Sequence, residues 1–368
     1  MVMISTPSAA LIPTLTLLIS LPIFFYFLAP RILPPRQIII SNPEELDDLS
    51  LFHKAIAMDS ANFSRRPHPR LPSVKSHLSS GKLRRPKIAF LFLTNSNLHF
   101  ALLWERFFTS SNLTIKTHDL YNIYVHADPV VKIDPLDGVF KGKIIPSKRT
   151  QRSSPTLISS TRRLLAAAIL DDPANTYFAL VSQTCIPLHS FNYLYSFLFD
   201  LRRMSRGLEF SSYIEILDDD PNLWDRYNAR GDNVMLPEVH FNEFRVGSQF
   251  FVLTRKHALT VIKDRKLWRK FKLPCLNQNS CYPEEHYFPS LLSMQDPNGT
   301  THYTLTRVNW TDSVNGHPHT YHPPEVSPEL IYTLRKSNSS YSYMFARKFS
   351  PDCLKPLMEI ADSVMFKD

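Results

Sequence analysis

The chain has 368 residues, of which 43% are hydrophobic and 12% aromatic, enough for one large or two modest folded domains. Its eight glycines form neither the Gly-x-Gly-x-x-Gly fingerprint of dinucleotide-binding folds nor a Walker loop, which argues against both chemistries. The net charge of +9 indicates an anionic partner, such as a phosphorylated small ligand, an acidic polysaccharide or an anionic lipid, and no nucleic-acid-binding motif is present.

Residues 1–86 are predicted to contain a membrane anchor and a linker. After a short tail at 1–9, residues 10–30 are almost wholly apolar and uncharged, close to the ~20 residues that cross a bilayer. A cleaved signal peptide is the alternative, but a positively charged start and a small-residue cleavage site are both missing. Residues 31–86 are rich in proline, serine and basic side chains, which indicates a stem or linker with room for one short helix near 49–58.

Two sets of residues give opposite predictions for the side of the membrane on which the rest of the chain lies. Arg31 and Arg36 follow the span and nothing basic precedes it, so the positive-inside rule alone places the rest of the chain in the cytosol. Asn-x-Ser/Thr sequons favour the lumen, where they would be glycosylation sites. The five sequons begin at Asn62, Asn112, Asn298, Asn309 and Asn338.

The cysteines and acidic clusters do not form a recognisable metal motif. None of the four cysteines has Cys-x-x-Cys spacing, which argues against a zinc or thioredoxin-like site. Cys275 and Cys281 flank a short polar loop that suits a small disulfide in an oxidising lumen, with two free thiols as the alternative. Asp218–Asp220 resemble an Asp-x-Asp motif, but Pro221 follows at once, so an exposed turn is favoured.

From Lys87 onward the pattern is that of a folded α/β domain, which we assign to residues 87–368. A continuous apolar run at 88–93 and largely apolar segments at 121–125 and 177–181 predict buried strands, and helical spacing follows each of them, at 98–108, 155–170 and 191–201. Alternating strands and helices predict a sandwich with a mostly parallel sheet. Ligands of such folds bind beyond the carboxyl ends of the strands, which is where Asn95, Asp128 and Ser182 fall.

The second half of the domain contains the candidate catalytic carboxylate. An apolar run at 250–253 predicts another buried strand, and Pro283 suits the first position of a helix. Glu284 and Glu285 then lie in the first turn, where a carboxylate complements the helix dipole and can face a cleft; an ordinary acidic first turn is the alternative. Further strands are predicted at 303–310 and 341–349, followed by an amphipathic helix to about residue 365.

Six segments, taken in order, resemble the Core-2/I-branching β-1,6-N-acetylglucosaminyltransferase family, in particular its plant branch. They are Tyr-Val-His-Ala-Asp at 124–128, Leu-Val-Ser-Gln-Thr-Cys-Ile-Pro-Leu at 180–188, Arg-Val-Gly-Ser-Gln-Phe-Phe-Val-Leu-Thr-Arg at 245–255, Pro-Glu-Glu-His-Tyr-Phe at 283–288, Val-Asn-Trp at 308–310 and Phe-Ala-Arg-Lys-Phe at 345–349. The resemblance implies a glycosyltransferase A-type fold and a Golgi enzyme anchored by its N-terminus, with the catalytic domain in the lumen. It also implies inverting transfer from a UDP-sugar to a glycan, without a metal ion.

The resemblance also implies roles for individual residues. Glu285 resembles the general base. On the donor side, Asp128 resembles a uridine contact and Lys348 a diphosphate contact, and the other residues expected there are Arg347, Ser182 and His319. On the acceptor side the expected residues are Trp310, Arg226 and Glu284. Because neighbours on a strand point to opposite faces, one of Arg347 and Lys348 is expected to face the ligand.

Two departures from the family pattern concern the donor site. A second basic residue that the family pairs with its lysine has no clear equivalent, because the region holds Glu325, with His319 and Arg335 as substitutes. Arg152-Ser153-Ser154 stands where many plant relatives have Trp-Gly or Trp-Ser. Three alternatives therefore stay open: UDP-glucuronic acid or UDP-xylose as the donor, an inactive membrane-tethered glycan-binding protein, and a cytosol-facing protein whose basic linker contacts anionic lipid.

Overall fold

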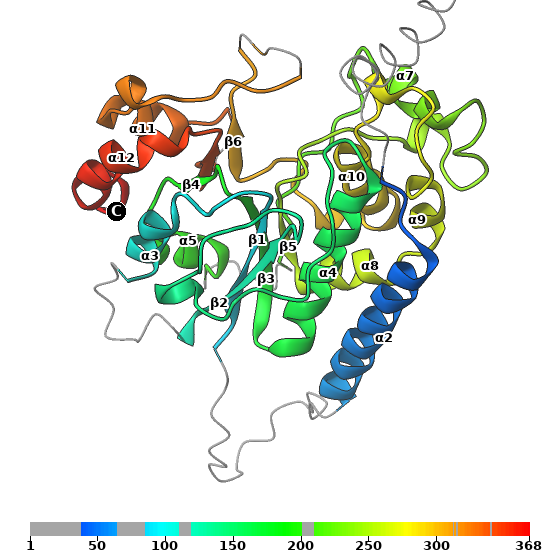
Figure 1. Cartoon of the computed structure of the whole chain (residues 1–368), viewed down its shortest axis with the longest axis horizontal. Coiled ribbons are helices and arrows are strands. Elements are labelled where there is room, and N and C mark those ends of the chain that lie inside the picture. The colour runs from blue at the N-terminus through cyan, green and yellow to red at the C-terminus, as the bar shows by residue number, and fades with distance from the viewer. Residues whose placement is uncertain are drawn as a thin grey trace, which may run out of the picture. The chain divides into compact units, whose positions relative to one another are not determined.

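A computed structural model describes residues 38–64, 85–109, 119–200, 210–311, 313, 316–338 and 341–368 (Figure 1). The span predicted at 10–30 and much of the predicted linker lie outside these residues. Among the residues described, no helix combines the length and the apolar character that a membrane crossing needs. The described residues from 39 onward form one compact unit.

The central sheet confirms the predicted α/β fold with mostly parallel strands. Its order is β2-β1-β3-β5, with β1 at Lys87–Thr94, β2 at Tyr121–Ala127, β3 at Asn175–Ser182 and β5 at Val252–Thr254. β1 pairs in parallel with β2 and β3, whereas β5 runs antiparallel to β3. The first three strands are nearly continuous apolar runs because both faces of the sheet are covered.

Helices cover both faces of this sheet. Alternate residues of β1 point to opposite faces, so Phe90 and Phe92 pack with one hydrophobic cluster and Leu91 with another. Figure 1 shows α3 and α5 on one side of the sheet and α4 and α8 on the other. The helices of the two layers are α3 (Ala101–Thr109), α5 (Phe191–Leu198), α4 (Pro155–Asp171), α8 (Arg255–Lys263), α9 (Lys266–Phe271) and α10 (Pro283–Gln295). The helix predicted at 155–170 is α4, which begins with Ser154 as N-cap and Pro155 in its first turn.

A smaller sheet brings the C-terminal segment beside the first. Its order is β4-β7-β6, with β4 at Ile186–Pro187, β7 at Phe345–Arg347 and β6 at Thr306–Val308. β6 and β7 are shorter than the strands predicted for these segments. The remaining helices are α7 (Leu223–Tyr227), α11 (Pro328–Arg335) and α12 (Leu354–Ile360), and a π-helical turn at Ala361–Met365 follows.

The segment expected to be a linker contains a long helix that packs on the domain. This helix, α2 (Asn42–Ser64), has 23 residues and buries Phe52 and Ala55 against the cluster around α4. Leu49, Leu51 and Ile56 also pack against this cluster, and ionic contacts add to them; the carboxylate residue Asp48 is only 4% exposed. Hydrophobic periodicity missed the full length of α2 because it counts such a residue as facing solvent.

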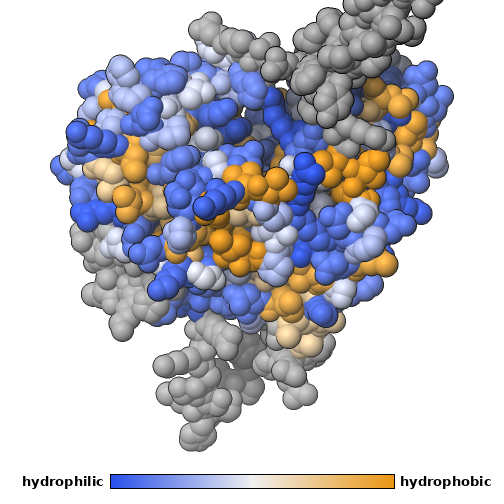
Figure 2. All heavy atoms as spheres, in the orientation of Figure 1, coloured by the Kyte–Doolittle hydropathy of each residue, from blue (hydrophilic) through white to orange (hydrophobic). Residues whose placement is uncertain are grey.

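The distribution of hydrophobic side chains on the surface and the state of the four cysteines are those of a folded domain. On the face shown in Figure 2, hydrophilic side chains cover most of the described surface, and the hydrophobic ones gather in smaller patches. Cys275 and Cys281 form a disulfide, as the sequence suggested, while Cys185 and Cys353 are buried free thiols.

Candidate active site

Two cavities share a wall near the edge of the central sheet: the second lies beyond the carboxyl ends of β1 and β3, and the first is lined in part by residues of β6 and β7. The first has a volume of about 360 Å³ and the second about 300 Å³. They share part of their walls, formed by Gln249, Phe250, Glu285, Trp310 and Arg347. Ligands of parallel α/β folds bind at this edge of the sheet, so the two cavities are the candidate site.

Glu285 lies in the wall that the cavities share. It is in the first turn of α10, and its Oε2 lies 3.2 Å from Nη1 of Arg226. The side chain is 28% exposed. Burial raises the pKa of Glu285, and the guanidinium groups of Arg226, Arg152 and Arg347 oppose that shift. A carboxylate in this setting combines access to both cavities with a raised affinity for a proton.

A glycine allows this turn to come close to the chain that faces it. The backbone N–H of Gly247 donates to the carbonyl oxygen of Glu285 (2.9 Å). A Cβ at Gly247 would lie only 2.0 Å from the backbone oxygen of Glu215. Any other residue would therefore push the backbone at 247 away from Glu215 and disturb the hydrogen bond that Gly247 makes to the first turn of α10.

Glu284, the next residue, faces a different environment from Glu285. It lies in the wall of the second cavity but not of the first, and it is 4% exposed. The N–H of Ser153 donates to its Oε1 (3.1 Å), while its Oε2 has no hydrogen-bond partner within the described residues. Burial, and then the neighbouring Glu285, raise the pKa of Glu284 to about 8. From the family resemblance Glu284 is expected on the acceptor side; in the structure it lines the second cavity, together with the cationic side chains.

The raised pKa of Glu284 predicts a pH-dependent effect of the Glu284→Gln substitution. The protonated Glu284 stabilises the folded state. This contribution is complete below the pKa that Glu284 has in the unfolded chain, and it is lost as the pH rises through the folded-state pKa of about 8. Gln keeps an oxygen for Ser153 and carries no charge. We expect little change in the free energy of unfolding at pH 5 and a gain of about 2–4 kcal/mol at pH 8. Urea unfolding at both pH values measures it; equal effects would contradict the shift.

The second cavity gathers three cationic side chains. Arg347 and Lys348 both line it, because β7 ends at Arg347 and strand alternation does not extend to Lys348. The Cζ of Arg347 lies 4.3 Å from the centre of the Phe250 ring. Arg152 is the third cation, and its Nη1 lies 2.7 Å from Nε2 of His317. Burial, and then the two arginines, lower the pKa of Lys348, so the cavity favours an anion.

Neither substitute for the missing second basic residue lies in this cation cluster. Nε2 of His319 is 2.7 Å from Oε1 of Glu325, and His319 is not part of either cavity wall. Arg335 donates instead to the backbone oxygens of Leu188 and Val364. The extra cation is Arg152, which the sequence showed only as a departure from the plant pattern just before the N-cap of α4.

Asp128 and Ser182, both at strand ends, are placed differently. Ser182 lines the second cavity. Asp128 is buried behind the wall, where it accepts hydrogen bonds from the N–H of Val130 (2.9 Å) and from both N–H and hydroxyl of Thr150 (2.8 Å each). Burial alone would raise the pKa of Asp128, but these hydrogen bonds outweigh it and hold the pKa below its usual value. Asp128 therefore does not line the cavity itself but holds Thr150, which does.

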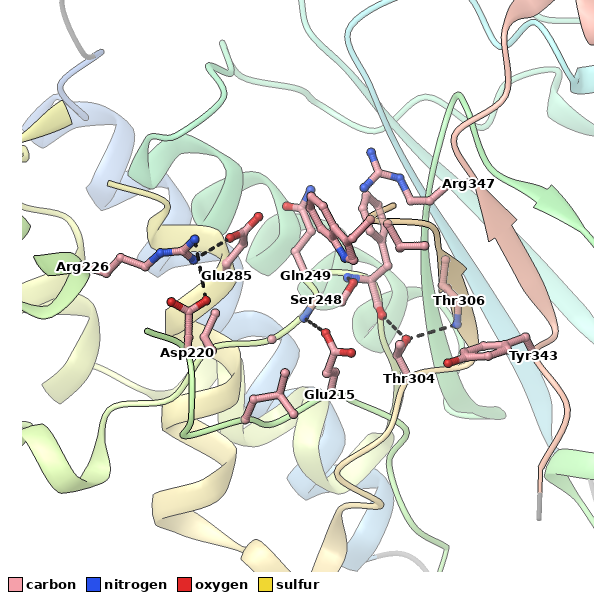
Figure 3. A pocket seen from close by; sticks show the side chains of 16 residues that line it. Glu215, Asp220, Arg226, Ser248, Gln249, Glu285, Thr304, Thr306, Tyr343 and Arg347 are labelled. Carbon is pink, nitrogen blue, oxygen red and sulfur yellow. Dashed lines mark hydrogen bonds and ion pairs between the residues drawn. The ribbon is translucent and has the colours of Figure 1, made fainter. Parts of the chain in front are cut away.

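The first cavity has polar and aromatic walls. Figure 3 shows Arg226 and Glu285 on one side of it and Tyr343 and Arg347 on the other. Arg226 also approaches Asp220 (3.9 Å), and Trp310, which is 53% exposed, borders both cavities. This set of hydrogen-bonding groups and rings suits a ligand with several hydroxyl groups.

The first cavity also contains a carboxylate that the sequence did not single out. Glu215 accepts a hydrogen bond from the N–H of Ser248 (3.0 Å), and burial raises its pKa. The sequence around Glu215 shows neither a hydrophobic periodicity nor a known motif, so it gave no reason to select this residue. Within the described residues, no group of three or more His, Cys, Asp or Glu side chains is arranged to hold a metal ion.

Comparison with known proteins identifies a family and a relative. A family model described as Core-2/I-Branching enzyme matches residues 88–335, which is more than half of the chain. Glycosyltransferase BC10 from Oryza sativa subsp. japonica is 27% identical over 314 residues, covering 72% of this chain and 74% of that protein. The matched family region includes Glu285, Arg226 and Trp310, and it ends before Arg347 and Lys348.

Proposed function

The chain belongs to the Core-2/I-branching enzyme family of glycosyltransferases, and we propose that it transfers N-acetylglucosamine from its UDP derivative to a hydroxyl group of a glycan. The transfer inverts the anomeric carbon and uses no metal ion. The observation that carries this proposal is Glu285 in the wall shared by a cationic cavity and a polar, aromatic one. A transfer enzyme needs one group that reaches both substrates.

The second cavity suits the nucleotide sugar. Arg152, Arg347 and Lys348 lie together there, so each is repelled by the others until an anion enters. A diphosphate supplies that anion, and its negative charge grows as it leaves. Fixed cations that neutralise this charge stabilise the transition state.

The first cavity suits the acceptor. Trp310 borders both cavities, and Arg226 and Glu215 add hydrogen-bonding groups. In the reaction, the acceptor oxygen attacks the anomeric carbon and its proton passes to Glu285. The bond from that carbon to the diphosphate breaks, and its electron pair stays with the departing UDP. One carboxylate is enough for this step, whereas glycosidases use two.

We place the catalytic domain in the Golgi lumen, held by an N-terminal anchor. The disulfide of Cys275 and Cys281 supports an oxidising compartment. Two sequon asparagines, Asn298 and Asn338, are exposed and accessible to glycosylation. Digestion of the protein from its native membrane with an endoglycosidase should lower its apparent mass; an unchanged mass would favour the cytosol.

The direct test of the proposed function is a panel of nucleotides and nucleotide sugars. UDP and UDP-N-acetylglucosamine should raise the melting temperature of the purified protein, because a ligand that binds the folded state stabilises it. Transfer is then followed as UDP release with glycan acceptors. Preferential stabilisation by UDP-glucuronic acid or UDP-xylose would change the sugar. Binding without turnover would favour an inactive glycan-binding protein, and no effect of any uridine nucleotide would overturn the donor site.

A further inference from the structure

The wall of the second cavity continues into a loop that α2 holds from outside. The 146–152 loop lies between β2 and α4, and its residues Thr150, Gln151 and Arg152 line the cavity. The middle of this loop, at Lys148, points its side chain away from the cavity cations and toward α2. Its Nζ lies 2.6 Å from Oδ1 of Asp48 and donates to the backbone oxygen of Glu44.

Asp48 is the centre of a buried ionic network. Its Oδ2 accepts a hydrogen bond from the hydroxyl of Ser159 on α4 (2.6 Å), and its Oδ1 is shared by Lys148 and Arg163. Arg163, also on α4, donates to the carbonyl oxygen of Pro146 through Nε (3.2 Å) and Nη2 (3.0 Å). The same carboxylate therefore ties down the loop directly and through Arg163. The neighbouring Asp47 also pairs with Lys148 (3.2 Å) and Arg163 (2.8 Å), but its side chain is 61% exposed, and exposed ion pairs contribute little.

The inner side of the loop is held by the sheet. Asp128 accepts both hydrogen bonds of Thr150, and Nε2 of His126 accepts the backbone N–H of Lys148 (3.1 Å). The loop is thus fixed between two carboxylates, one on β2's end and one on α2. Asp128 fixes the part of the loop nearest the cavity, and Asp48 fixes the part before it.

We infer that α2 contributes to donor binding, and that Asp48 on this helix is a positioning residue of the donor site. By anchoring Lys148 and Arg163, Asp48 holds the 146–152 loop so that Thr150, Gln151 and Arg152 face the nucleotide diphosphate. This inference rests on the proposed function of the second cavity. It also means that the segment leading from the N-terminal region into the domain influences donor affinity.

The test compares two carboxylates on the same helix. Asp48→Asn removes the buried carboxylate that holds the loop and leaves Lys148 and Arg163 only the exposed Asp47. The matched control is Asp59→Asn, because Asp59 pairs with Arg255 (2.7 Å) on α8, about 16 Å further along the helix axis, and touches no part of the loop. Both variants loosen α2. We expect Asp48→Asn to raise the KM for the UDP-sugar and the Kd for UDP ~10–100-fold with a smaller change in kcat, and Asp59→Asn to leave both constants unchanged.

A second variant covers the case in which Asp48→Asn fails to fold. Lys148→Met removes the tie on the loop side, while Asp48 keeps Arg163 and Ser159. It should raise the same two constants. Equal constants in the wild type and in Lys148→Met, or equal effects of the Asp48 and Asp59 substitutions, would overturn the inference.

Lys348→Ala separates this inference from the proposed function. If Lys348→Ala weakens UDP binding and the loop variants do not, the second cavity binds the donor but α2 has no part in it. If Lys348→Ala also leaves the Kd for UDP unchanged, the assignment of the donor cavity is itself wrong. Calorimetric titration with UDP measures all four variants in the same way.

Discussion

Replacing Glu285 by Gln is expected to lower kcat for sugar transfer ~10²–10⁴-fold, the range that a positioned general base contributes. Gln has the same shape and can still contact Arg226, which lies 3.2 Å from the carboxylate. It cannot take the proton of the acceptor hydroxyl. The Kd for UDP should change little, because the cations of the second cavity remain.

The matched control for this prediction is Asp225→Asn. Asp225 is an exposed carboxylate on α7, beside Arg226 in the sequence, and it lies outside both cavity walls. Its substitution should leave turnover unchanged. Turnover of Glu285→Gln at the wild-type rate would remove Glu285 as the base. Since burial raises the pKa of Glu285, the wild-type rate should also fall as the pH drops through that raised value.

Lys348→Ala is expected to weaken UDP binding about 10–100-fold, which corresponds to a charge-assisted hydrogen bond worth roughly 1.5–3 kcal/mol. Lys348 lines the second cavity, and within the described residues no carboxylate forms an ion pair with it. Its lowered pKa reflects burial and two nearby arginines, so the free protein gains nothing from this charge. The melting temperature without ligand should therefore stay the same or rise, while stabilisation by UDP is lost.

Lys355→Ala serves as the control for Lys348→Ala. Lys355 lies on α12, seven positions further along the chain, and is exposed. Removing it changes the net charge by the same amount without touching either cavity. If both substitutions weaken UDP binding equally, the effect is one of overall charge, and Lys348 does not contact the diphosphate.

The sequence predicted secondary structure correctly where a local pattern marks an element buried on both faces or the start of a helix. β1, β2 and β3 are nearly continuous apolar runs, and the first turn of α4 follows from Ser154 and Pro155. The antiparallel direction of β5 could not be predicted, since a short apolar run carries no information on its partner. The length of α2 was missed because its contacts with the domain are ionic as well as apolar.

The sequence by itself determined the α/β class, the order of the elements and the family, because these depend on patterns along the chain. Only the tertiary structure decided which side chains share a cavity. Glu284 and Glu285 are adjacent, yet their directions on the helix give them different surroundings. His319 lies against Glu325, and Arg152 joins Lys348 from nearly 200 positions away. Contacts between distant segments depend on how whole elements pack, and no local pattern encodes them.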